Sequence, residues 1–122
     1  MTQLVQYTFE PIIIPQEEID YYQELHNNVL NNFIRNFQEH IEIIDNQLRF
    51  LNHQFFTITR SNLVESLDWE EVHKIQQSYI DKKIELLQQK DLKQRKIQIV
   101  EEILIQRRRN PRNRHIQVYN RN

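Results

Sequence analysis

The chain has 122 residues and a mass of 15.2 kDa, which fits a single domain with a modest core, because a second core would leave each half too small to be stable. It contains neither glycine nor alanine, and without glycine it cannot easily form the positive-φ turns of phosphate loops, dinucleotide-binding motifs or nucleophile elbows. Its net charge of -1 conceals an acidic body and a basic end: seven Lys or Arg stand against fourteen Asp or Glu up to residue 90, and nine against three from residue 91 onward.

The first 15 residues are predicted to form an extended arm. Apolar and polar residues alternate from residue 5 to residue 9, which is the period of a strand, and Pro11 and Pro15 disfavour helix at the residues before them. An apolar arm of this kind needs a surface to lie against. We therefore assign to a partner interface the three residues between the prolines: Ile12, Ile13 and Ile14.

A long amphipathic helix is predicted from residue 16 to residue 56. Pro15 suits a helix start, and Glu17 and Glu18 complement the helix dipole. Apolar residues then recur, mostly three or four positions apart, which places them on one helical face. They are Ile19, Tyr22, Val29, Phe33, Phe37, Ile41, Ile44, Leu48, Leu51 and Phe55.

A second helix is predicted from residue 68 to residue 109, after a connector that mixes β-branched residues with cap formers. Asp68 and Glu71 have the spacing of a capping box. The apolar stripe of this helix is interrupted between Gln88 and Lys96, where Leu92 is the one apolar residue. Either the helix continues there with solvent around it, or two shorter helices meet near residue 90.

Residues 110–122 are predicted to form a basic carboxyl-terminal arm, in which residues 115–119 are compatible with a short strand pairing with the amino-terminal arm. Guanidinium groups match phosphate geometry and stay charged at any relevant pH. The arginine cluster therefore indicates binding to nucleic acid or to an acidic partner, and the alternative is a solvated helix end. Its members are Arg107, Arg108, Arg109, Arg112 and Arg114.

These elements predict an all-α fold: one helical domain over residues 1–122, formed by a long antiparallel, coiled-coil-like hairpin with extended arms at both ends. Two helices of about 40 residues would each be about 60 Å long and would enclose no core between them. Such a hairpin exposes apolar surface, so we expect it to associate with itself or with other proteins.

Aromatic residues gather at the predicted connector. Trp69, Phe50, Phe55 and Phe56 are most simply the packing end of the hairpin. The alternative is a hot spot for a partner protein, and on that interpretation Trp69 and Phe55 belong to the interface.

No catalytic or cofactor-binding motif is apparent. The chain has no cysteine, and its three serines lack a neighbouring histidine in a nucleophile motif. Glu70 and His73 form a single Glu-x-x-His pair, whereas a carboxylate-bridged di-metal site needs two such pairs. We therefore expect no enzyme activity, no bound metal and no cofactor.

The compartment is predicted to be intracellular. The absence of cysteine fits a reducing environment, and no apolar run approaches the roughly 20 residues of a membrane span. A secretory signal begins with basic residues, whereas the first basic residue of this chain is Arg35. The function that these features favour is that of an accessory or structural subunit, which docks through apolar helical faces and extended arms into a larger assembly or a homo-oligomer. The alternative is a nucleic-acid-binding protein that uses the arginine cluster.

Overall fold

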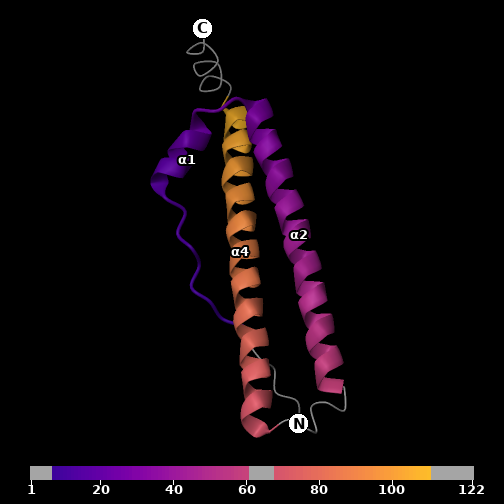
Figure 1. The fold of residues 1–122 in the computed structure, drawn as a ribbon. Coiled ribbons are helices and arrows are strands. Elements are labelled where there is room, and N and C mark those ends of the chain that lie inside the picture. Colours follow the sequence, from indigo (N-terminus) through magenta and orange to yellow (C-terminus); the bar gives the residue numbers. More distant parts are fainter. Residues whose placement is uncertain (1–6, 61–67, 111–122) are drawn as a thin grey trace.

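The computed structural model describes residues 7–60 and 68–110. It contains α1 (Gln16–Gln23), α2 (Asn27–Arg60) and α4 (Trp69–Arg109). Helices α2 and α4 lie side by side as an antiparallel hairpin, and α1 packs beside the carboxyl-terminal part of α4 (Figure 1). The predicted all-α hairpin is confirmed. The described part of the amino-terminal arm, residues 7–15, is extended but forms no strand, and the predicted strand at residues 115–119 lies outside the described residues.

Helix α4 is continuous over 41 residues, so the helix boundary considered near residue 90 does not exist. It begins directly after the predicted N-cap, since Asp68 Oδ1 accepts a hydrogen bond from the Glu71 amide at 2.8 Å. This bond satisfies one of the amide groups that a helix start leaves unpaired. At the other end, arginines occupy the last turn, where cations complement the helix dipole.

The polar middle of α4 is not surrounded by solvent either. Most of residues 88–96 are half-buried, because they hold neighbouring segments through polar groups instead of apolar ones. The arm, α1 and α2 each receive at least one such contact. The contacts are Gln88 Nε2 to the Glu10 carbonyl (2.7 Å), Lys90 Nζ to Asp45 (2.7 Å), Arg95 to the Ile12 carbonyl, and Lys96 Nζ to Glu18 (3.1 Å).

The first predicted helix is wrong in one respect: instead of one helix over residues 16–56, there are two helices separated by residues 24–26, and the second continues to Arg60. The Glu24 and Leu25 amides close the end of α1 with short-range bonds to the Tyr21 and Tyr22 carbonyls, both 3.1 Å. This break lets α1 fold back onto the hairpin. There Tyr22 of α1 is buried against residues of α2 and α4.

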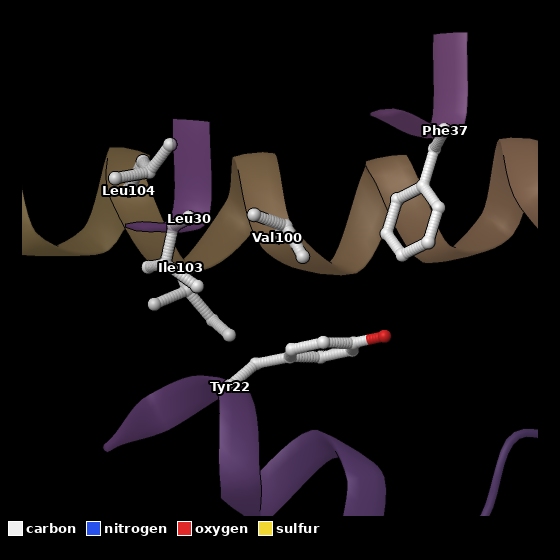
Figure 2. Close-up of a cluster of buried hydrophobic side chains, with 6 residues drawn as sticks. All are labelled: Tyr22, Leu30, Phe37, Val100, Ile103 and Leu104. Carbon is white, nitrogen blue, oxygen red and sulfur yellow. The ribbon is translucent and has the colours of Figure 1, made fainter. Parts of the chain in front are cut away.

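The core lies where these three helices meet. Figure 2 shows Tyr22 of α1 reaching towards α4 among buried side chains of all three helices. Leu30 and Val100 are fully buried there, and the Tyr22 ring meets the Phe33 ring edge-on at 5.5 Å. The whole cluster comprises Tyr22, Leu30, Phe37, Val100, Ile103 and Leu104. We call this half of the hairpin the core end.

The other half, α2 residues 43–60 and α4 residues 69–86, is here called the open end. Among the described residues, two helices meet there, and Ile44 and Leu86 are its buried apolar residues. No helix of the described chain is both long and apolar enough to cross a membrane.

Candidate interaction surface

An open apolar groove lies at the open end, between α2 and α4. Its volume is about 520 Å³. The exposed side chains Ile43 and Phe50, at 55% and 63% exposure, form its α2 wall. The complete lining is Ile43, Asn46, Gln47, Phe50, Leu51, Gln54, Lys82 and Leu86, so that polar groups edge an apolar surface.

This groove continues the side of the hairpin that α1 covers at the core end. Phe33 contacts Tyr22 of α1, and Leu51 in the groove lies 18 residues further along α2. Eighteen residues are about five helical turns, so Phe33 and Leu51 point in the same direction from α2. On α4, Lys82 in the groove and Val100 in the core are also 18 residues apart, so they too point in the same direction. Within residues 7–60 and 68–110, a third helix thus covers one half of this side and leaves the other half open.

The predicted aromatic interface is divided by the structure. Phe55 packs within the hairpin, because its ring stacks on that of Tyr79 with 4.1 Å between centroids. Trp69, Phe50 and Phe56 are exposed, Trp69 to 80%, so the predicted packing end does not include them. Phe56 contacts the Arg60 guanidinium, 4.0 Å from its ring.

The predicted isoleucine interface lies far from these aromatic residues, beside the carboxyl-terminal half of α4. Ile13 is 86% exposed and Ile14 is half-buried. Both line a second shallow groove with Ile19 of α1 and Ile99 of α4. Ile12 is exposed to 39%, and its backbone carbonyl accepts from Arg95. The structure therefore does not bring the predicted interface residues together on one surface.

A polar cluster beside the groove ties the arm to the hairpin. The Tyr79 hydroxyl donates to Asn52 Oδ1 at 2.6 Å, and Lys83 Nζ donates to the same hydroxyl at 3.1 Å. Lys83 also lies 4.4 Å from the centre of the Tyr7 ring. Burial alone would lower the pKa of Lys83, but the hydrogen bond to Tyr79 and the nearby tyrosines outweigh it and raise the pKa. Lys83 therefore stays charged, which suits a packing role better than proton transfer.

The arginine cluster is also divided. Arg107 is 93% buried, and its guanidinium donates to Asn27 Oδ1 at 2.7 Å and to the Gln23 carbonyl at 2.9 Å. Arg107 thus fastens the junction of α1 and α2 to the last turn of α4. Arg108 and Arg109 are exposed, whereas Arg112 and Arg114 lie outside the described residues.

The Glu-x-x-His pair shows no arrangement for metal binding. Glu70 lies 3.9 Å from Lys74 Nζ one turn away, and His73 is exposed. Within the described ranges, no three His, Asp or Glu side chains are grouped in a way that could hold a metal ion.

Comparison of the chain with protein-family models, with curated proteins and with solved structures gives no match.

The groove was only partly visible in the sequence. Phe50 is one of the aromatic residues near the predicted connector, but Ile43 falls outside the predicted stripe of Ile41 and Ile44. Ile43 and Phe50 are seven residues apart, which is about two helical turns. This second, shorter apolar line beside the main stripe is the signal that would have identified the α2 wall of the groove.

Proposed function

We propose that the chain is a non-enzymatic accessory subunit that docks a helix of a partner protein into the groove at its open end. The observation that carries this proposal is the exposed apolar wall formed by Ile43 and Phe50. Single exposed apolar residues are ordinary, but a groove that gathers several of them between two helices is typical of a protein-binding surface.

An amphipathic helix is the occupant that fits best. On the same side of the hairpin, the core end is covered by α1, whose Tyr22 packs between α2 and α4. The groove repeats this arrangement with an apolar floor at Leu51 and Leu86 and polar groups along its rim. A helix with one apolar face would cover the floor and leave its polar face in water.

The proposal is tested by site-specific photocrosslinking in the cells that make the protein. A benzoylphenylalanine at position 50 faces the groove, and one at the exposed position Glu39 on α2 serves as the matched control. We expect position 50 to give a discrete adduct with one protein and Glu39 to give none. Mass spectrometry of the adduct identifies the partner and the segment that contacts the groove.

Two results would overturn the proposal. One is the absence of any adduct from position 50, and the other is the same pattern of adducts from both positions. An adduct whose crosslinked segment is not helical would keep the groove as a docking site but would exclude the proposed occupant.

The second candidate function is nucleic-acid binding, which one observation favours. Arg108 and Arg109 are exposed at the end of α4, adjacent to the acid-free residues 110–122. Arg107 contributes to the fold, so a truncation that begins at residue 107 would also disturb the junction of α1 and α2. The informative variant ends at Asn110 and carries Arg108→Gln and Arg109→Gln. Loss of salt-sensitive binding to DNA or RNA is expected if this function is real, and unchanged binding would exclude it.

A further inference from the structure

The junction between α1 and α2 interrupts an amphipathic pattern that the sequence does not interrupt. Tyr22, Leu25 and Val29 are spaced three and four positions apart, so the apolar face crosses residues 24–26 without a change of phase. The junction contains no glycine or proline. Glu24 has φ -87° and ψ -10°, close to helical values. The local sequence is therefore compatible with one continuous helix over residues 16–60.

Contacts with α4 hold the junction bent. Arg107 binds Asn27 and the Gln23 carbonyl on either side of it. Tyr22 is buried against α4 residues, and Glu18 pairs with Lys96 at 3.1 Å. All these contacts join residues 18–27 to α4. The contacts of Tyr22 and Glu18 with α4 do not require that both sides belong to the same copy of the chain.

We propose that two copies of this chain exchange residues 7–23, so that α1 of each copy packs on α4 of the other. In the exchanged form, residues 16–60 of each copy become one helix. The two copies meet at their core ends, related by a two-fold axis perpendicular to the hairpin. Domain exchange of this kind creates a dimer at low cost, because it reuses contacts that already exist within one copy.

The direction of α1 satisfies the geometry of this exchange. Within one copy, Glu10, Glu18 and Gln23 contact α4 at Gln88, Lys96 and Arg107 respectively, so the arm and α1 run parallel to α4 and antiparallel to α2 (Figure 1). Straightening the junction makes α1 continue along the direction of its own α2. The two-fold axis places it parallel to α4 of the second copy, as within one copy.

Two opposing effects set the balance between the closed and exchanged forms. Continuing the helix through residues 24–26 adds backbone hydrogen bonds that the junction now lacks. The entropy cost of association opposes the exchanged form, and so does the repulsion between Arg108 and Arg109 of the two copies, which approach each other at the core ends. Because salt screens this repulsion, the exchanged dimer is expected to form more readily at high ionic strength. The exchange does not involve the groove at the open end, so either proposal stands if the other fails.

Crosslinking between two single-cysteine variants tests the exchange directly, because the chain has no cysteine of its own. The full-length variants Glu18→Cys and Lys96→Cys are unfolded, mixed and refolded together at high protein concentration. They are then treated with a short bismaleimide. We expect a crosslinked pair that contains one chain of each variant, identified by isotope labelling of one of them. In the matched control, His73→Cys at the open end replaces Lys96→Cys, and we expect at least tenfold less of the mixed pair.

The double variant Glu18→Cys, Lys96→Cys verifies that the two positions are within reach of the reagent. The proposal is overturned if this double variant links only within single chains while the mixture gives no more mixed pairs than the His73→Cys control. The shape of the dimer provides a second measurement. The exchanged dimer should be a rod of about 120 Å, twice the roughly 60 Å of a 41-residue helix, whereas a dimer with overlapping hairpins would remain near 60 Å.

Variants of the junction distinguish exchange from other dimers. Insertion of Gly-Ser-Gly-Ser between Leu25 and His26 lengthens the junction and should lower the yield of mixed pairs at least fivefold, because a longer connection relaxes the closed form. Asn28→Ala removes a poor helix former next to the junction and should raise the yield about threefold. If the insertion leaves the yield unchanged, the dimer does not arise by exchange at this junction.

Discussion

At the scale of single residues, Arg107 has the most specific role in the described chain. Among residues 7–60 and 68–110 it is the buried charged residue, and its two bonds reach a side chain and a carbonyl that lie 80 and 84 residues earlier. The planar fork of a guanidinium suits this double contact, which the single ammonium of lysine cannot reproduce.

Replacing Arg107 by Met should lower the free energy of unfolding by about 2 kcal/mol, because the Gln23 carbonyl and Asn27 Oδ1 lose charged donors in a buried site. Arg107→Lys should fall between Met and the unchanged chain. The exposed neighbour Arg108 provides the matched control, and Arg108→Met should change stability by no more than about 0.5 kcal/mol. Urea unfolding followed by circular dichroism measures both. Equal effects at the two positions would contradict the role of Arg107 in holding the junction of α1 and α2 to α4.

The carboxylate of Glu18 makes stability depend on pH. Burial alone would raise its pKa, but hydrogen bonds from Tyr22 and Lys96 outweigh burial and lower the pKa below the ordinary value of 4.5. The Tyr22 hydroxyl, 2.6 Å away, correspondingly has its pKa raised by burial and by Glu18. The stabilisation by Glu18 is therefore complete at neutral pH. It should be lost as the pH falls from about 5 through the lowered pKa, because the unfolded chain takes up the proton first.

Glu18→Gln should reduce this loss of stability in acid, and Lys96→Met should reduce it in part, since Lys96 is one of the two partners of the carboxylate. Urea midpoints measured between pH 3 and pH 7 give the comparison. An acid dependence that is identical in the unchanged chain and in Glu18→Gln would show that other groups cause it.

At the scale of elements, α2 belongs to two different environments along its length. Leu30 is fully buried in the core, whereas Phe50 is largely exposed in the groove. Leu30→Ala should therefore destabilise the isolated chain by about 2–5 kcal/mol, the range for a buried leucine that leaves a cavity. Phe50→Ala should cost less than about 1 kcal/mol in the same thermal or urea measurement. Comparable losses at both positions would mean that the open end is packed as tightly as the core end.

The elements differ in how far the sequence could predict them. The spacing of apolar residues and the capping pair Asp68 and Glu71 predicted α4 to within one residue at its start. The break at residues 24–26 could not be predicted, because no glycine or proline marks it and it depends on contacts with α4. The burial of Arg107 was also out of reach, since its partners lie at the other end of the sequence. The sequence shows that the apolar stripe of α4 is interrupted at residues 88–96. It does not show the cause, which is a set of polar contacts with the arm, α1 and α2.

At the scale of the whole molecule, the hairpin is completed at one end and incomplete at the other. Three helices enclose a core that includes Leu30 and Val100, and two helices leave a groove that includes Ile43 and Phe50. The proposed function depends on this asymmetry. A domain that closed both ends equally would have no apolar groove between α2 and α4 to offer a partner.

Hydrogen exchange of backbone amides in the isolated chain, at a concentration where it is monomeric, tests this asymmetry most directly. Amides of α2 around Leu30 and Phe37 should exchange only through global unfolding, whereas those around Phe50 and Phe55 should exchange at least about a hundredfold faster, because fewer buried contacts hold the open end. Equal protection along the whole of α2 would contradict the account, since it would mean that the hairpin needs nothing more to complete its open end.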